Sequence, residues 1–398
     1  MVMKLCIILF ALALHVEVNG DNPDTFLEVP GMIVHDGYPQ ETYRVMTEDG
    51  YALTVHRIPH GRGVGNCTDC DKPVVVLDHG LFGSSSNWIF AGVNSALGYM
   101  LADRNYDVWM PNTRGNVYST IYTPRRDPRT KEFWDFSWHE GGIYDMPATI
   151  DYILEKTGKK KIFYVGHSMG TTMFYVMMSQ RPEYNDKVAA MVSLAPIAFV
   201  NHARIGLLSV FADHSSLVNS LLDLIGLTQL KPMSHMLSKI VTTLCFETPM
   251  ISDVCQKLII SVFGFDLIGL NQTLIPVYFN NMFSGSSTKQ IMHYAQIFKS
   301  GRFCQYDYGL IDNLIRYHSI HPPSYNISEV KIPVALFYAD GDKFGDVIDV
   351  KKLYKKLPNV IKLFKVPYSG FSHQDFVTHK YIATLVNKPI IDIFESYT

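Results

Sequence analysis

The sequence predicts an α/β fold in which a mainly parallel sheet is flanked by helices. From Tyr43 onward, short apolar runs alternate with segments of helical periodicity, as expected where helices connect neighbouring parallel strands. A Gly-His-Ser-Met-Gly pentapeptide at 166–170 lies between one such run and one such helix. That context is typical of a nucleophile elbow, in which a serine is held on a sharp strand-to-helix turn.

The predicted sheet strands are spread over most of the chain. They are Tyr43–Thr47, Tyr51–Ile58, Val74–Leu77, Asp107–Met110, Ile162–Val165, Val188–Leu194, Val334–Tyr338 and Ile361–Val366. The first two form a hairpin, because the intervening Asp49-Gly50 pair favours a tight turn. Helical patterns cover Asn94–Arg104, Tyr144–Lys156 and Thr171–Gln180.

One interval is too long for an ordinary crossover. Roughly 130 residues separate the last two strands from the six before them, whereas connections are normally short. The interval is rich in Leu, Ile, Phe and Met, as in Leu258–Phe265. We therefore predict a mainly helical insertion at 199–328, between core segments 21–198 and 329–398. It is either a subdomain with its own core or a cap whose apolar inner face covers the serine.

The N-terminus has the features of a secretory signal peptide. Lys4 supplies the positive charge, Leu5–Leu14 the apolar segment, and Gly20 ends a stretch suited to cleavage. We therefore expect residues 1–20 to be removed from a protein that is secreted or sent to lysosomes. The apolar segment is too short to span a bilayer, so no transmembrane anchor is expected.

The charge pattern argues against a nucleic acid partner. The chain has 35 basic and 37 acidic residues, which gives a formal net charge of −2. The single basic block, Lys159–Lys161, lies directly before a predicted strand. Nucleic acid binding proteins instead concentrate basic residues on one face.

The glycosylation motifs and cysteines agree with an oxidising compartment. Three Asn-x-Ser/Thr motifs begin at Asn66, Asn271 and Asn326. After cleavage of the signal peptide, five cysteines remain: Cys67, Cys70, Cys245, Cys255 and Cys304. The first two form a short loop disulfide or no bond rather than a metal site, because no second ligand pair follows at metal spacing. Cys245 and Cys255 are a second candidate disulfide.

Two later loops supply partners for the serine. Ser168 needs a base to remove its proton, and the base needs a carboxylate to orient it. In elbow enzymes the acid and then the histidine follow the serine, each in a loop after a later strand. Asp342 follows Val334–Tyr338, and His373 follows Ile361–Val366. The order predicts a triad of Ser168, His373 and an acid from the loop of Asp342.

Both partners have rivals in the sequence. Asp340 and Asp346 occupy the same loop as Asp342, and position alone does not separate the three. His379 is read as a solvated helix residue, while His318 and His321 precede the penultimate strand and so lie in the wrong place.

An oxyanion hole is expected from two backbone N–H groups. Met169 starts the helix after the serine, where free N–H groups and the helix dipole favour negative charge. The other donor is expected in the His-Gly turn after Val74–Leu77, with the N–H of Leu81 as the candidate.

At this point the chain resembles the acid lipases, the family of gastric lipase, lysosomal acid lipase and their invertebrate relatives. The resemblance covers nearly the whole mature chain. Its main motifs are Gly37–Pro39, Thr47–Tyr51, His79–Leu81, Asn112–Asn116, Tyr144–Asp151 and Gln305–Gly309.

The resemblance implies an α/β-hydrolase fold with Ser168 as nucleophile, His373 as base and Asp342, rather than Asp346, as acid. The family hydrolyses triacylglycerols and, in lysosomal members, cholesteryl esters beneath a mobile lid, and it needs no metal or organic cofactor. Two positions depart from its pattern. Met169 replaces the usual Gln, and Phe263 stands where the partner of Cys255 is expected, which directs attention to Cys245 instead.

We therefore expect a serine esterase that acts on neutral lipid esters at a lipid–water interface. An acyltransferase that uses the same acyl-enzyme is the main alternative. A non-catalytic lipid carrier is a second one, although a pure binder has no need of a complete triad.

Overall fold

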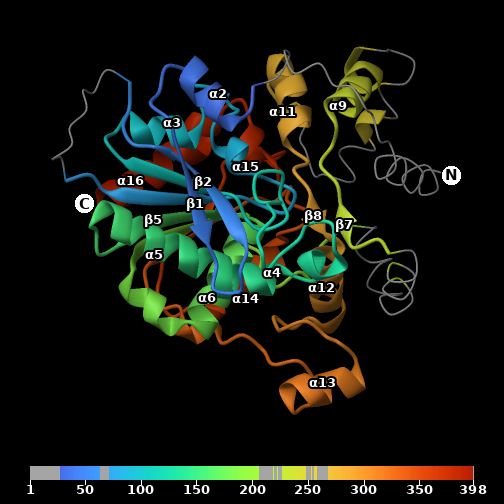
Figure 1. Cartoon of the computed structure of the whole chain (residues 1–398). Helices are drawn as coiled ribbons and strands as arrows, with labels where there is room; N and C mark the ends of the chain where they lie inside the picture. Colours follow the sequence, from blue (N-terminus) through green and yellow to red (C-terminus); the bar gives the residue numbers. More distant parts are fainter. Residues whose placement is uncertain are drawn as a thin grey trace.

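The computed structural model describes residues 27–62, 71–205, 218, 222, 226–247, 252, 255–257 and 268–397. Its centre is an eight-stranded sheet with the order β1-β2-β4-β3-β5-β6-β9-β10 (Figure 1). The strands are β1 (Glu41–Met46), β2 (Ala52–Ile58), β3 (Val74–Asp78), β4 (Asp107–Pro111), β5 (Ile162–His167), β6 (Val188–Leu194), β9 (Val334–Tyr338) and β10 (Val360–Lys365).

The sheet is antiparallel at one edge and parallel over the rest. β1 pairs with β2 and β2 with β4 in antiparallel fashion, while the other neighbouring pairs are parallel. β3, β4 and β5 are buried along their whole lengths, as expected for strands covered on both faces. This arrangement confirms the predicted α/β-hydrolase fold, and all eight predicted strands are present.

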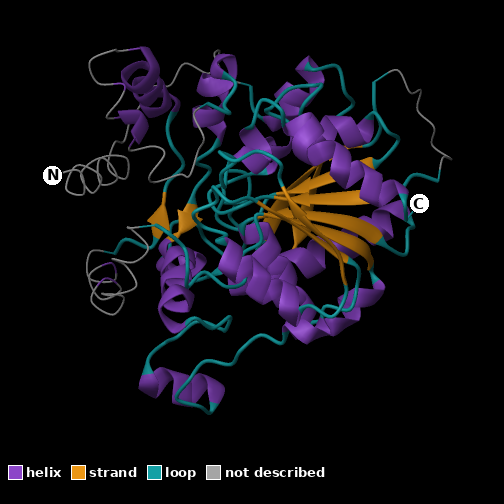
Figure 2. Ribbon diagram, turned by 180° about the vertical axis from the view of Figure 1, so that it is seen from behind, coloured by secondary structure: helices purple, strands orange, loops and turns teal. Residues whose placement is uncertain are grey.

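Helices cover both faces of the sheet (Figures 1 and 2). On one face lie α2 (Val29–His35), α3 (Leu97–Ala102), α15 (Asp375–Thr378) and α16 (Lys388–Glu395); on the other lie α4 (Trp138–Glu140), α5 (Met146–Thr157), α6 (Met169–Gln180) and α14 (Val347–Lys356). Successive residues of β3 point to opposite faces of the sheet. Val75 packs in the apolar core beneath the first group of helices, and Val76 packs in the core beneath the second group. The two apolar cores therefore hold the sheet between them.

Short helical turns complete the core and the insertion. The 3-10 turns are Ser85–Trp88, Lys131–Trp134, Pro182–Asp186, Gln272–Leu274 and Ile327–Glu329, and the π turns are Gly141–Asp145, Thr243–Glu247 and Ala383–Asn387. The helix predicted at Asn94–Arg104 is shorter than expected. Its first residues form a turn instead, and the extended backbone of Ala96, with φ −75° and ψ 133°, delays the start of the helix to Leu97.

The interval between β6 and β9 contains its own elements. They are β7 (Gln229–Leu230), α9 (His235–Thr242), α11 (Ile275–Asn281), β8 (Ser286–Ser287), α12 (Thr288–Ser300) and α13 (Leu310–Tyr317). Figures 1 and 2 place them together on one side of the sheet. β7 and β8 pair as a small antiparallel sheet, which the sequence did not indicate. The predicted apolar run Leu258–Phe265 lies outside the described residues, as does Phe263 within it.

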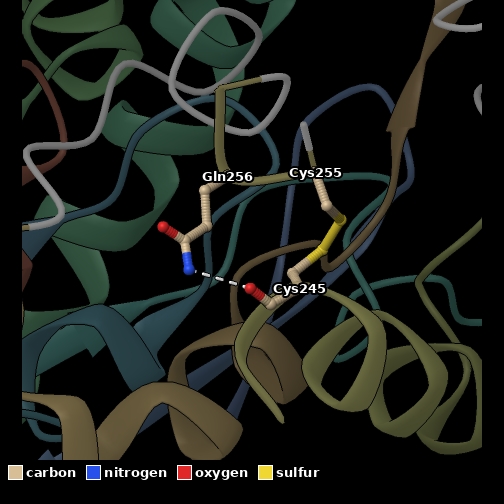
Figure 3. Close-up of a disulfide and its surroundings, with 3 residues drawn as sticks. All are labelled: Cys245, Cys255 and Gln256. Carbon is tan, nitrogen blue, oxygen red and sulfur yellow. Dashed lines mark hydrogen bonds between the residues drawn. A yellow bond between two sulfur atoms is a disulfide. The ribbon is translucent and has the colours of Figure 1, made fainter. Parts of the chain in front are cut away.

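A disulfide joins Cys245 to Cys255 in this interval, with their Cα atoms 5.1 Å apart (Figure 3). The side chain of Gln256 donates to the carbonyl oxygen of Cys245 at 2.9 Å. Cys304 is a buried free cysteine, and burial raises the pKa of its thiol. Cys67 and Cys70 lie outside the described residues, together with Asn66 and the expected signal peptide.

Two of the expected glycosylation sites lie within the described residues. Asn326 is exposed and Asn271 is half-buried. Each side-chain oxygen accepts a hydrogen bond from the N–H two residues ahead, on Ser328 and Thr273 respectively. Across the described ranges, no helix is both long and apolar enough to cross a bilayer.

Candidate active site

Ser168 occupies a strained turn between β5 and α6. Its backbone has φ 52° and ψ −113°, which non-glycine residues rarely adopt. The flanking glycines permit the turn. A Cβ on Gly166 would lie 2.8 Å from the carbonyl carbon of Gly170, and a Cβ on Gly170 would lie 2.6 Å from the carbonyl oxygen of Asp78. Larger residues at these two positions would push the strand and the helix apart.

Ser168, His373 and Asp342 form a continuous hydrogen-bonded chain. The Ser168 Oγ lies 2.8 Å from His373 Nε2. On the other side of the ring, His373 Nδ1 lies 2.9 Å and 3.0 Å from the two carboxylate oxygens of Asp342. With the ring proton on Nδ1, the imidazole donates to Asp342 and accepts from the serine hydroxyl. This arrangement is suited to removing the serine proton.

The Asp342 carboxylate is buried, and protein groups donate hydrogen bonds to it. Burial alone would raise its pKa, but the neighbouring charge and hydrogen bond of His373 lower the pKa below its usual value. The N–H groups of Phe344 and Gly345 contribute to the same effect, donating to Oδ1 at 2.8 Å and 2.9 Å. Asp342 is therefore an anion that can stabilise an imidazolium beside it.

The other acids of this loop are engaged elsewhere. Asp340 forms an ion pair with Lys365 at 2.5 Å. Asp346 caps α14 by accepting from the N–H of Ile348 at 2.9 Å, and it pairs with Arg204 at 3.2 Å. Of these three acids, Asp342 alone has an oxygen that accepts from His373.

The rival histidines lie apart from Ser168 in different environments. His318 and His321 are exposed. The expectation that His379 is solvated is wrong, because it is only 1% exposed. Its ring packs against Phe371 at a centroid distance of 5.1 Å, and its backbone forms a bridge to Leu270 of the insertion. His379 is thus a core residue that ties the insertion to the C-terminal loop.

The loop after β3 lies directly beside the serine. A Cβ on Gly80 would lie 3.2 Å from Ser168 Cβ, a tighter contact than most Cβ atoms make, so the loop and the serine are in close approach. The carbonyl of Gly80 accepts from the N–H of Gly83 at 3.0 Å, which closes a turn around Leu81. Met169 is the first residue of α6, where N–H groups have no acceptor within the helix. Both candidate donors therefore belong to segments that border Ser168.

A buried network fixes that loop. His79 Nδ1 donates to the carbonyl of Gly80 at 2.8 Å, and its Nε2 accepts from the N–H of Thr113 at 3.2 Å. The amide of Asn116 approaches the same Nε2 at 3.3 Å. Burial lowers the pKa of His79 to about 4, so the ring stays neutral and keeps this tautomer. Two motifs that are far apart in the sequence thus support one turn.

His167, which directly precedes Ser168, had no predicted role. Its Nε2 lies 3.0 Å from the carbonyl oxygen of His373 and donates to it. Burial, together with the charge of His373, lowers the pKa of His167 to about 3, so the ring remains neutral. Asp375 fixes the same loop from the other side, since its carboxylate accepts from the N–H of Ser372 at 2.6 Å. In the sequence, His167 and Asp375 could be noticed only as polar residues within the motifs around Ser168 and His373.

A second buried pair lies under the elbow. The Tyr164 hydroxyl donates to Asp78 at 2.6 Å. Burial raises the pKa of the Asp78 carboxyl to about 7 even though the Tyr164 hydrogen bond lowers it.

Among the described residues, no group of three or more His, Cys, Asp or Glu side chains has the geometry of a metal site.

The chain is similar to known proteins over most of its length. A family described as "alpha/beta hydrolase fold" matches residues 73–221, and one described as "Partial alpha/beta-hydrolase lipase region" matches residues 29–92. Lipase 3 of Drosophila melanogaster is 37% identical over 92% of each chain. Bovine gastric triacylglycerol lipase is 36% identical over 89% of this chain and 88% of its own.

Two further comparisons extend the similarity. The lysosomal acid lipase/cholesteryl ester hydrolase of Macaca fascicularis is 34% identical over 98% of this chain and 97% of its own. Among solved structures, a candidate lipase from Sulfolobus solfataricus superposes with a TM-score of 0.60 at 12% identity. That superposition covers 90% of this chain and 94% of the other, and at such low identity it supports the fold alone.

Proposed function

Because this chain belongs to the α/β-hydrolase lipase family, we propose that it cleaves neutral lipid esters through an acyl-enzyme on Ser168. The observation that carries the proposal is the continuous hydrogen-bonded chain from Ser168 through His373 to Asp342. A serine hydroxyl that donates to an imidazole nitrogen, with the ring itself oriented by a buried carboxylate, is the arrangement that ester hydrolysis requires.

Each residue has a defined role in the proposed reaction. His373 takes the proton of Ser168 as its Oγ attacks the ester carbonyl, and then gives that proton to the leaving alcohol. Asp342 holds the tautomer and offsets the positive charge on the ring. The N–H groups of Leu81 and Met169 donate to the oxyanion of the tetrahedral intermediate. Water, activated by His373, then releases the fatty acid and restores the serine.

The substrate class follows from the relatives. Their names include a triacylglycerol lipase and a cholesteryl ester hydrolase, and triacylglycerols and cholesteryl esters are both uncharged esters. We infer the same class here, with the insertion at 199–328 as a cap above Ser168 and 21–198 and 329–398 as the core. The secretory pathway is the inferred location, whether the protein is exported or sent to lysosomes. Glycans on Asn66, Asn271 and Asn326 would agree with that route.

The test is hydrolysis of triolein and cholesteryl oleate from acid to neutral pH. The wild-type chain is compared with Ser168→Ala, which removes the nucleophile and leaves the turn intact. We expect fatty acid release from at least one ester and a loss of at least about 10⁴-fold in the variant. Equal rates in the two proteins would rule out Ser168 as the nucleophile.

Adding a sterol or alcohol to the assay separates hydrolysis from acyl transfer. A hydrolase releases mainly free fatty acid, while an acyltransferase makes a new ester with the added alcohol. No turnover of any ester, together with tight binding of the intact lipid, would instead identify a carrier.

A further inference from the structure

The polarity of α13 is the reverse of that expected for a surface helix. Its four aliphatic side chains point outward: Leu310 is 64% exposed, Ile311 72%, Leu314 52% and Ile315 69%. A surface helix normally buries such a stripe and turns its polar residues to water. At helical spacing, these four positions share one side of α13, so they form a single apolar face.

The opposite side of α13 is polar and is anchored to the protein. The buried Asn313 side chain donates to Asp307 at 2.7 Å and to the carbonyl of Ile320 at 3.1 Å, and it accepts from the N–H of Tyr308 at 2.9 Å. The Tyr317 hydroxyl donates to the carbonyl of Tyr306 at 2.9 Å. Hydrogen bonds therefore fix the orientation of the helix and hold its aliphatic face outward.

The helix also stands away from the rest of the molecule. In both views α13 lies at the outer edge, separate from the layers around the sheet and beyond α12 (Figures 1 and 2). Ile320, in the loop that follows, is also half exposed and adds to the apolar surface. An exposed aliphatic cluster of this kind marks an interaction site.

We propose that the α13 face, defined by Leu310, Ile311, Leu314 and Ile315, inserts into the surface of a lipid aggregate. This inference rests on the proposed function, which requires the enzyme to work at such a surface. The α13 face consists of four aliphatic side chains, whereas a stable protein interface uses roughly 20–30 residues from each partner, so a second copy is not the proposed occupant. A few aliphatic side chains are sufficient for shallow insertion below lipid headgroups.

The charges of α13 indicate which lipid surface it suits. Asp312 and Arg316 are one helical turn apart and cancel, and the Arg316 guanidinium lies 4.2 Å from the Tyr308 ring centroid. The helix therefore lacks the excess of basic residues by which interfacial helices select anionic lipids. We expect binding to neutral surfaces, such as phosphatidylcholine around triacylglycerol, with little dependence on salt.

The test measures how the full chain partitions onto lipid. The Ile311→Ser/Ile315→Ser variant is compared with a control, Val34→Ser/Ile348→Ser, which alters two comparably exposed aliphatic residues on α2 and α14. All proteins carry Ser168→Ala to prevent turnover, and thermal unfolding verifies that they fold. With phosphatidylcholine-coated triolein droplets, the α13 variant should lose at least about ten-fold in partitioning. The control should change less than two-fold.

Two results would overturn the inference. One is equal partitioning of the α13 variant and the control. The other is a concentration-dependent dimer of the parent chain that the α13 variant abolishes, which would make a second copy the occupant. Turnover of a soluble short-chain ester, measured with Ser168 restored, is independent of α13. If that turnover is absent in the wild type the proposed function fails, and if it is present while partitioning is unchanged only the α13 inference fails.

Discussion

His167 donates a hydrogen bond from Nε2 to the backbone carbonyl of His373 across 3.0 Å. The residue directly before the proposed nucleophile therefore holds the loop of the proposed base. The two rings also lie close, with centroids 5.2 Å apart. The relative position of Ser168 and His373 thus depends on a contact between their own segments.

Replacing His167 with Phe should lower kcat by about 10- to 100-fold while KM changes little. The ring volume is retained, but the N–H that holds the His373 carbonyl is lost, and small misplacements of a catalytic group are costly. The measurement is steady-state hydrolysis of a short-chain ester.

His293→Phe is the matched control for this experiment. His293 is also fully buried, and its Nε2 lies 3.0 Å from the carbonyl oxygen of Cys304, remote in sequence from the triad loops. A similar loss of kcat in both variants would mean that general destabilisation, and not the His373 loop, is responsible.

Asp342→Asn should reduce kcat by on the order of 10⁴-fold, because the amide favours the wrong tautomer of His373 and cannot stabilise its charge. Asp340→Asn changes an acid of the same loop that pairs with Lys365 and should have less than about a three-fold effect. Kinetics of both variants with one soluble ester test the assignment. A larger loss from the Asp340 variant would reverse it.

Met169→Gln should leave kcat within about three-fold of the wild type. The proposed oxyanion contact uses the backbone N–H of this residue. The Met169 side chain is buried in the apolar core on the α6 side of the sheet. Gln is close to Met in length, so the helix start is retained. A loss of 100-fold or more in the short-chain ester assay would show that the side chain itself takes part.

Asp78 should make folding less stable as pH rises. Its pKa of about 7 in the folded protein exceeds the ordinary value of 3.8. Its contribution is therefore complete below about pH 4 and is lost progressively as pH rises through 7, by about 1.4 kcal/mol per pH unit. Asp78→Asn imitates the protonated form and should remove this dependence.

The measurement is denaturant unfolding of wild type and Asp78→Asn at several pH values. We expect similar stabilities near pH 4 and a growing advantage of the variant up to about pH 7. Parallel curves for the two proteins at every pH would mean that Asp78 is already ionised in the folded state.

The strands were predictable because short buried apolar runs rich in β-branched or aromatic residues, such as Val74–Leu77 and Val334–Tyr338, leave a strong local signal. The roles of Ser168, Asp342 and His373 were suggested by their order along the chain, and they remain a prediction that kinetics must test. The geometry between those residues depends on how three separate loops meet. That information does not exist in any single segment.

What the sequence could not supply were long-range contacts. His379 was misjudged because its burial depends on Leu270 and Phe371, which belong to other segments. The role of His167 depends in the same way on the carbonyl of His373, 206 positions away. Local periodicity reports neither contact, since both form only when the sheet brings distant loops together.

Covalent labelling tests whether Ser168 is the nucleophile. The full chain is treated with a p-nitrophenyl phosphonate ester, digested, and examined by peptide mass spectrometry. We predict one phosphonate adduct, on Ser168, formed in step with the loss of ester hydrolysis and absent from Asp342→Asn at matched times. An adduct on another residue, or complete inactivation with Ser168 unmodified, would show that Ser168 is not the nucleophile.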